Sequence, residues 1–598
     1  MTPLPLQIHN GRWLSHLRRR AVTEEELAAF TSGEVKLSPT AARIAASRTR
    51  GSAAVSTLFA TAADLTHPDQ LPDALLAAQR MVRALADREI IALVSDSDTD
   101  GLTSHALSRL ILEQQFNTAP AQLISEIGHK INDGYGLSDN LCQRLLQRTP
   151  RPTLVITMDC GSSDEARIAQ LKEAGIDVIV TDHHELPQAS PPPSALATLS
   201  PIRADSGYGD PTIAGCMVAW LFWCQVRVAL IESNRLPASA PKLSRYLDFV
   251  ALGTVADCVT LAHSHNNRAV VKLGLEIINR SNHPAWQIVR QEAGSHGTIN
   301  ASALAFDVAP RINGASRMAT PWPALKFLLT PNHSEAEQLW LEISGYNQQR
   351  KQVQQQMVQQ AMAQIRLIDF RYQYGLALYL AEGHPGVQGI VASRLLERSG
   401  MPVACMTPHR HDEQLLSGSM RSLDTVHARK VLQHCFDTIP DCGPGYGGHA
   451  AAGGFTLYRD KLPQFIHHFC AAIEQQHPQP FEPVIYSDGE LATELLSLDL
   501  VTELERLEPF GRQFPAAAFE AIFTIERLFH MGKNGEHLRL ELTACHHRFN
   551  AVWFFALDPL GNTPVVQGQS YRFLFTPIRN DYRGMEALQL RVTGIITV

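Results

Sequence analysis

The spacing of hydrophobic residues changes along the chain and predicts where helices and strands lie. In residues 1–84, apolar side chains recur at helical spacing after acidic starts, as at residues 24–30 and 73–81, so we expect an N-terminal helical region. At residues 90–94 the pattern becomes a short, continuous apolar run. Such a run is typical of a strand that is buried on both faces of a parallel sheet.

The same strand pattern returns at residues 153–157 and 178–180, and helical periodicity over residues 102–115 and 164–174 separates the runs. Strands that alternate with helices predict βαβ units and a parallel sheet. We therefore expect an α/β domain at residues 85–330.

The middle of the chain predicts a long helix. Val353, Met357, Ala361 and Ile365 are spaced every four residues within a glutamine-rich stretch. A low-complexity tract would lack this regular spacing, so we expect a connecting helix at residues 331–368.

Two further domains are expected after this helix. Residues 369–480 begin with another apolar run and predict a second α/β domain, which the proline-containing segment 479–483 ends. Short strand-like runs at residues 538–542, 551–555 and 571–575 predict a small β-barrel of OB type within residues 481–598.

The composition is that of an ordinary globular protein, with 45% hydrophobic and 19% charged residues among 598. The net charge of −7 argues against a nucleic-acid coat protein but not against a local basic groove. Ten cysteines without a Cys-x-x-Cys pair indicate neither a zinc finger nor a disulfide scaffold.

No secretory or membrane segment is predicted. The first residues lack a charged region followed by an apolar region. The most apolar window, residues 213–231, contains Gln225 and Arg227, so we expect a buried helix there instead of a membrane span. Together with reduced cysteines, this pattern predicts a cytoplasmic protein with no membrane partner.

Side chains that bind metal ions follow the predicted strands. The first strand ends in Ser-Asp-Ser-Asp-Thr-Asp-Gly, the second in Met-Asp-Cys-Gly and the third in Thr-Asp-His-His-Glu, and a later apolar stretch ends in Asp257. Because the carboxyl ends of parallel strands meet at one edge of a sheet, we expect these side chains to lie together. The candidate metal ligands are Asp96, Asp98, Asp100, Asp159, His183 and Asp257.

Several carboxylates with a minority of imidazole suit two divalent cations, Mn²⁺ or Mg²⁺. We expect Asp159 to bridge the two ions and Asp98 to bind one of them. The other ion is expected to take Asp100, His183 and Asp257. A helix N-cap is the alternative explanation for a single aspartate before a helix, and it is strong for Asp96.

The ordered motifs resemble a known family. Residues 95–104, 158–161, 181–184 and 251–257 resemble the four motifs of the DHH phosphoesterases. Further segments resemble the RecJ branch of that family, the single-strand-specific 5′ to 3′ DNA exonucleases; they lie at residues 309–318, 384–394, 417–422 and 447–454. The similarity runs from about residue 70 almost to the C-terminus, and residues 504–511 resemble the segment that leads into the OB domain of that family.

The resemblance implies a function as well as a fold. Residues 85–330 would form the DHH catalytic domain, 369–480 a DHH-associated substrate-binding domain and 481–598 an OB-like nucleic-acid-binding domain. The activity it implies is metal-dependent hydrolysis of phosphodiester bonds in single-stranded DNA, in DNA repair or recombination. A single-strand-binding protein or a helicase is the kind of protein partner that we expect.

The resemblance also implies roles for residues other than the metal ligands. His184 corresponds to a residue that contacts the scissile phosphate, so it joins Asp159 as a catalytic candidate. Asp182 is expected to orient a histidine without binding metal itself. The candidate substrate-binding residues are Lys130, Arg311, Arg317, Ser419, Arg421 and His449.

Two departures from the family bear on these roles. Lys130 stands where the family often has Arg, and Lys offers a point charge instead of a planar fork to a terminal phosphate. Residues 512–515 read Arg-Gln-Phe-Pro where the family prefers Gly-Asn-Pro. Two other functions stay open: a DHH-type phosphodiesterase for short RNA or cyclic dinucleotides, and a non-catalytic DNA-binding replication factor.

Overall fold

Contacts divide the chain into two compact units in the computed structural model. We call Glu24–Gln349 with Leu507–Pro515 the parallel-sheet unit, and Met1–Thr23 with Arg350–Arg506 and Ala516–Val598 the barrel unit. Each unit has a hydrophobic core of its own. The structure describes residues 7–10, 13–32, 36–49, 54–129, 133, 136–186, 190–293, 298–365, 374–479, 481, 484–532, 535–557, 562–582 and 585–597.

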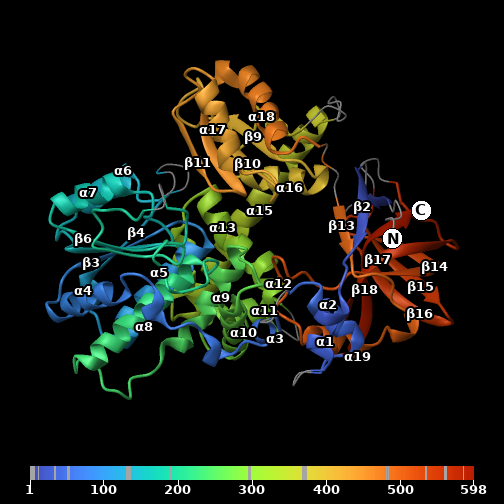
Figure 1. The fold of residues 1–598 in the computed structure, drawn as a ribbon, viewed down its shortest axis with the longest axis horizontal. Helices are drawn as coiled ribbons and strands as arrows, with labels where there is room; N and C mark the ends of the chain where they lie inside the picture. The colour runs from blue at the N-terminus through green and yellow to red at the C-terminus, as the bar shows by residue number, and fades with distance from the viewer. Residues whose placement is uncertain are drawn as a thin grey trace. The chain divides into compact units, whose positions relative to one another are not determined.

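The parallel-sheet unit is built on five strands in the order β4-β3-β5-β6-β7, and every neighbouring pair is parallel. Strands β3, β4 and β6 of this sheet are labelled in Figure 1. All residues of β3 and β5 are buried, which is why the sequence shows continuous apolar runs there instead of alternation. The strands are β3 (Ile91–Ser95), β4 (Leu123–Ile127), β5 (Leu154–Met158), β6 (Asp177–Thr181) and β7 (Ala197–Leu199).

Helices connect the strands, so the predicted βαβ units are confirmed. The helix α5 (Thr99–Leu110) follows β3, α6 (Asp139–Gln147) follows β4 and α7 (Glu165–Glu173) follows β5. Other helices of this unit are α4 (Ala74–Ala86), α8 (Gly215–Glu232), α9 (Leu247–Ala256), α10 (His265–Arg280) and α13 (Ala309–Met318).

Helix α8 is the apolar helix expected at residues 213–231. Among the described helices it alone is long and apolar enough to cross a membrane by length and composition. However, 72% of its 18-residue window is buried inside the protein, where α4, α5 and α9 pack against it. This burial confirms the prediction of a core helix.

The long connecting helix is also confirmed. Helix α15 (His333–Ile365) has 33 residues, and Met357, Ala361 and Ile365 of the predicted apolar stripe are buried. The division of the whole chain into five domains stays a prediction.

The barrel unit contains the second α/β fold. Its five-stranded sheet has the order β11-β12-β10-β9-β8, in which only the β8–β9 pair is parallel, and three helices pack on it. The elements are β8 (Leu376–Tyr379), α16 (Gln388–Ser399), β9 (Val403–Pro408), β10 (Leu415–Arg421), α17 (Ala428–Thr438), β11 (Gly445–Gly448), β12 (Ala452–Tyr458) and α18 (Leu462–Gln476).

The C-terminal strands close into the predicted barrel. The ring runs β18-β16-β15-β14-β17, and the pairing of β17 with β18 closes it, which removes exposed sheet edges. The predicted runs fall in β15, β16 and β17. The strands are β14 (Phe519–Met531), β15 (His537–Ala544), β16 (His547–Trp553), β17 (Ser570–Tyr582) and β18 (Met585–Thr597).

The N-terminal helical prediction is wrong for residues 7–10 and 13–19. These residues form a hairpin of β1 (Gln7–Asn10) and β2 (Trp13–Arg19). Strand β1 pairs with β18, and β2 pairs with β13 (Val484–Ser487), so the start of the chain extends the barrel sheet. The partners β18 and β13 lie near the other end of the chain, so the local pattern does not show the pairing that makes these segments strands.

A partly buried ion pair stabilises the pairing of β2 with the barrel sheet and yields a prediction. Arg19 donates to Glu520 Oε1 (2.9 Å) and Oε2 (2.7 Å), and the Glu520 side chain is fully buried while Arg19 is half-exposed. Arg19→Ala should cost about 1–2 kcal/mol locally, because it removes charge-assisted hydrogen bonds from a buried carboxylate. Hydrogen exchange of β2 and β14 should therefore accelerate roughly tenfold by mass spectrometry.

Arg18→Ala is the matched control, because Arg18 is the exposed neighbour on the same strand. It should leave exchange in both strands unchanged. Equal exchange rates in the two variants would contradict the role assigned to the Arg19–Glu520 pair.

Candidate metal centre

The ends of three adjacent strands carry most of the predicted ligands. Asp96 and Asp98 follow β3, Asp159 follows β5 and His183 follows β6, so they share the carboxyl edge of the sheet. The prediction that Asp257 follows a strand is wrong, because Asp257 is the C-cap of helix α9. A short apolar run does not distinguish a buried helix from a buried strand, which explains the difference.

Helix N-termini orient two of the aspartates. Asp98 is the N-cap of α5 and accepts hydrogen bonds from the backbone N–H groups of Asp100 (3.0 Å) and Gly101 (3.1 Å). Asp100 in turn accepts from Gly215 N (2.7 Å) and Cys216 N (2.9 Å), where α8 begins. A carboxylate has about four lone-pair sites, so capping leaves further sites for a metal ion. Capping and metal binding are therefore compatible at both positions.

Asp159 is held in a strained and crowded position. Its φ is +59°, its backbone N–H donates to Thr181 O (2.9 Å), and the residue is 2% exposed. A Cβ on Gly215 would lie 2.7 Å from Asp159 Oδ1 and 2.8 Å from its Cβ. Only glycine lets the start of α8 approach this closely.

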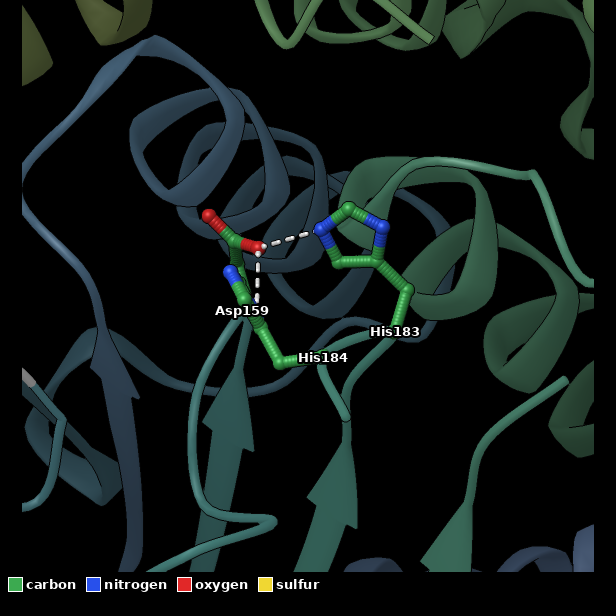
Figure 2. Close-up of side chains that lie close together, drawn as sticks. All are labelled: Asp159, His183 and His184. Atoms are coloured by element: carbon green, nitrogen blue, oxygen red, sulfur yellow. Dashed lines mark ion pairs between the residues drawn. The ribbon is translucent and has the colours of Figure 1, made fainter. Parts of the chain in front are cut away.

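The His183 ring faces the carboxylates. Its Nε2 lies 3.2 Å from Asp159 Oδ1, and Figure 2 shows the ring directed at this oxygen. The same nitrogen is 3.7 Å from Asp257 Oδ2 and 3.8 Å from Asp100 Oδ2. Although Nε2 is buried, it has no hydrogen-bond partner among the described residues.

These distances suit ligands that share a divalent cation. Ligand atoms about 2.1 Å from one ion are about 3 Å apart at right angles, and about 4 Å apart when opposed. Ligand atoms that lie within 4.8 Å of one another form three groups: Asp100–His183–Asp257, Asp96–Asp98–Asp159 and Asp159–His183–His184. Oxygen donors with imidazole are the donor set of Mn²⁺ or Mg²⁺ sites, so the residues present fit such ions.

The carboxylates repel one another, and the centre needs positive charge. Burial raises the pKa of Asp159 well above its usual range, and Asp100 and Asp98 raise it further. Burial, followed by the same two neighbours, raises the pKa of Asp257. Burial also raises the pKa of Asp100. A divalent cation would supply the missing charge and keep these groups ionised.

Asp182 holds both histidines in place. Its Oδ1 accepts hydrogen bonds from the backbone N–H groups of His183 (2.7 Å) and His184 (3.1 Å), and lies 2.7 Å from His184 Nδ1. Its Oδ2 accepts from Ser162 N (3.0 Å). Burial opposes a charge on the His184 ring, but Asp182 outweighs burial and raises the pKa of His184 to about 9.

The two arginines of α13 have different surroundings. Burial lowers the pKa of Arg317, while the charges of Asp98 and Asp96 raise it, so its guanidinium is near these carboxylates. The donors of Arg311 instead bind Asp307 O (2.6 Å), Ser344 Oγ (3.1 Å) and Glu292, and its guanidinium lies 4.8 Å from the ring of Trp340. These contacts favour a structural role for Arg311.

The remaining predicted substrate residues belong to the barrel unit, apart from Lys130. Ser419 and Arg421 lie on β10 of the barrel unit, where Arg421 Nη1 donates to Ser419 Oγ (3.0 Å). His449 follows β11 in the same sheet, and its backbone N–H donates to Ala452 O (2.9 Å). Lys130 lies outside the described residues.

Three contributors to the centre were missed in the sequence. Gly215 and Cys216 act through backbone N–H groups, and Asn313 Oδ1 accepts from Thr99 N (2.9 Å), which ties α13 to α5. The only sequence signal for the first two is a glycine at the start of an apolar helical run, since backbone donors carry no residue signature.

Comparisons with known proteins agree with this architecture. Residues 90–254 match the DHH family, N-terminal domain, residues 373–475 the DHHA1 domain and residues 487–594 the RecJ OB domain. The chain is 30% identical over 549 residues to a single-stranded-DNA-specific exonuclease RecJ from Haemophilus influenzae, covering 90% of this chain and 92% of the relative. The RecJ protein of Dickeya dadantii is 31% identical over 539 residues, covering 85% and 88%. The chain belongs to the RecJ family. The resemblance seen in the sequence motifs is thus confirmed.

Solved structures of this family share the fold. The crystal structure of RecJ in complex with Mn²⁺ from Thermus thermophilus matches with a TM-score of 0.75 and 27% identity, over 97% of this chain and 79% of that chain. The structure in complex with Mg²⁺ from the same organism matches with a TM-score of 0.70 and 25% identity. The likeness confirms the predicted mixed α/β fold with a parallel sheet and an OB barrel.

The close approach at Gly215 leads to a prediction. Gly215→Ala should weaken Mn²⁺ binding at least about tenfold, because the added Cβ displaces Asp159 from the ligand cluster. Isothermal titration calorimetry with Mn²⁺ measures this loss. Gly345→Ala on α15 is the control, since its Cβ would meet nothing within 4 Å. Mn²⁺ affinity that stays unchanged in Gly215→Ala would show that the α8 contact does not organise the site.

Proposed function

We propose that the chain is a metal-dependent exonuclease that hydrolyses phosphodiester bonds of single-stranded DNA in the 5′ to 3′ direction, in DNA repair or recombination. The observation that carries the proposal is the meeting of two ligand groups, Asp100–His183–Asp257 and Asp96–Asp98–Asp159, at one sheet edge. Membership of the RecJ family, whose relatives are named single-stranded-DNA-specific exonucleases, supports the choice of substrate.

The relatives of known structure were solved with Mn²⁺ or Mg²⁺, and we propose the same ions here. Two divalent cations supply an activated water and stabilise the attacking and leaving oxygens of a phosphodiester. We assign Asp159 as the bridging ligand, because it belongs to one carboxylate group and also lies 3.2 Å from His183. Asp96 and Asp98 would hold one ion, and the other would take Asp100, His183 and Asp257.

His184 is assigned to the phosphate that is cut. Asp182 accepts the hydrogen bond of its Nδ1, which fixes the ring and leaves Nε2 as the nitrogen to donate to a phosphate oxygen. In the metal-free protein, Asp182 raises the pKa of the ring to about 9, which favours the protonated form. A charged donor suits an oxygen that gains negative charge in the transition state. Asp182 is therefore a positioning residue, and His184 a catalytic one.

Phosphate contacts away from the metal ions are assigned to arginines and polar groups. Arg317 is favoured, because its guanidinium is near Asp96 and Asp98. Arg311 is not retained, because its donors are committed to neighbouring groups. We keep Lys130, Ser419, Arg421 and His449 as proposed substrate contacts.

The two other functions are less well supported. A phosphodiesterase for short RNA or cyclic dinucleotides would not need a closed OB barrel, because such a barrel binds longer strands. A non-catalytic replication factor has no need of two intact ligand groups. We also propose that the protein works in the cytoplasm with a single-strand-binding protein or a helicase.

The proposal predicts the products of one digestion experiment. Single and double strands labelled at the 5′ or the 3′ end are incubated with the protein and Mn²⁺ or Mg²⁺. Single strands should lose the 5′ label first as mononucleotides or short products, duplexes should be spared, and EDTA should stop the reaction. Asp159→Ala should lower turnover by a factor of at least about 1,000, because the bridging ligand is lost.

Intact single strands with either metal would rule out the nuclease. Cleavage of dinucleotides or cyclic dinucleotides in the same preparation, with long strands spared, would select the phosphodiesterase. Absence of tight Mn²⁺ binding in a calorimetric titration, together with binding of DNA that is not hydrolysed, would select the replication factor.

Substitutions of the two adjacent histidines should have different effects on Mn²⁺ affinity and on kcat. His183→Ala should weaken Mn²⁺ binding roughly tenfold or more, because it removes a ligand from the Asp100–Asp257 group. His184→Ala should keep Mn²⁺ affinity and lower kcat by about 100-fold, because it removes a donor to the phosphate. Calorimetry and steady-state rates on one oligonucleotide measure both effects. Equal loss of metal affinity in the two variants would refute the division of roles.

A further inference from the structure

The segment Leu507–Pro515 packs on the parallel-sheet unit, although the chain on either side of it belongs to the barrel unit. Arg268 of α10 binds the backbone of this segment. The guanidinium donates to the carbonyl oxygens of Leu507 (2.8 Å) and Pro509 (3.3 Å). The same guanidinium lies 4.4 Å from the centre of the Phe514 ring. The segment is therefore anchored along its length.

The side chain of Arg268 is buried, and its hydrogen bonds go to backbone carbonyl oxygens. Arg268 is 2% exposed, and its remaining donors bind Leu261 O (3.0 Å) and Leu58 O (3.3 Å). Burial lowers its pKa to about 10. At the end of the segment, Arg48 Nε donates to Pro515 O (2.7 Å). Every one of these bonds ends on a backbone carbonyl, so the course of the backbone is fixed independently of its side chains.

Within this segment a tight turn presents Arg512. Gly511 N donates to Phe514 O (2.9 Å), and Phe514 N donates to Gly511 O (3.1 Å). The carbonyl of Arg512 accepts a hydrogen bond from Leu261 N (3.1 Å). Leu261 is four residues after Asp257 in the loop that follows α9. The turn is thus joined to the loop that carries a metal-ligand candidate.

The side chain of Arg512 is a cation at the rim of the metal centre. The residue is exposed, and its guanidinium has no hydrogen bond or ion pair with any described residue. It is still close enough for its charge to interact with the carboxylate of Asp257.

The carboxylates of this centre repel the phosphates of a nucleic-acid strand. A guanidinium on a fixed turn offsets that repulsion, and its planar fork matches two oxygens of a phosphate. We propose that Arg512 binds a phosphate of the DNA strand beside the metal centre. This inference rests on the proposed function for the identity of the strand. It assigns a substrate-binding role to a position where this chain departs from the residues that its family prefers.

The experiment compares Arg512→Ala and Arg512→Lys with wild type and with Arg235→Ala. Arg235 is an exposed arginine of the same unit, and it lies beyond the end of α8 opposite to Gly215, roughly 27 Å along the helix. Binding of a fluorescent single strand is measured in EDTA over a range of NaCl concentrations. Hydrolysis in Mn²⁺ and Mn²⁺ affinity are measured separately.

Arg512→Ala should weaken strand binding and raise KM roughly tenfold, with kcat and Mn²⁺ affinity close to wild type. The slope of log affinity against log salt should fall by about 0.7, the value for one phosphate contact on a single strand. Arg512→Lys should keep the slope and recover part of the affinity. Arg235→Ala should match wild type throughout.

Strands with a 5′-phosphate and with a 5′-hydroxyl separate two sources of the phosphate. Equal losses for both strands identify an internal phosphodiester, and a loss confined to the phosphorylated strand identifies the terminal group. An unchanged affinity and salt slope in Arg512→Ala would overturn the proposal. Binding is measured without metal. A wild-type protein that binds DNA but does not hydrolyse it would therefore refute the nuclease, while the comparison of Arg512→Ala with wild type would still test the phosphate contact.

Discussion

Repulsion among buried carboxylates is the constraint on which the rest of this structure depends. Asp100, Asp159 and Asp257 are packed around one imidazole, and burial together with their neighbours raises the pKa of each of the three carboxyls. Such a cluster is unfavourable unless divalent cations compensate its charge. The same property makes it useful, because ions held by several carboxylates are available to polarise an anionic phosphodiester.

Backbone elements of the fold hold the carboxylates of this cluster together. Parallel strands deliver Asp98, Asp159 and His183 to one edge, and the first turns of α5 and α8 orient the carboxylates of Asp98 and Asp100. A Cβ on Gly253 would lie 2.7 Å from Asp100 Oδ1, so α9 also approaches at a glycine. The geometry of the metal centre therefore depends on strand ends, helix ends and closely packed glycines together.

Much of the fold and of the metal centre could be predicted from the sequence, and physical reasons explain both the correct and the wrong predictions. Continuous apolar runs followed by acidic turns identify buried parallel strands, because side-chain pattern and burial are directly linked there. The strands at residues 7–10 and 13–19 and the helical origin of Asp257 could not be predicted, because they depend on pairing and packing with distant parts of the chain. The side-chain partners of Arg311 are likewise a property of the folded state alone. The roles of individual site residues stay predictions until they are tested.

The most direct test of the central claim is a crystal structure of the protein with Mn²⁺, with the ions located by anomalous scattering. We expect two anomalous peaks on either side of Asp159, one in contact with Asp98 and the other with His183 and Asp257. A single peak, or peaks that do not share Asp159, would contradict the division of the cluster into two joined metal sites.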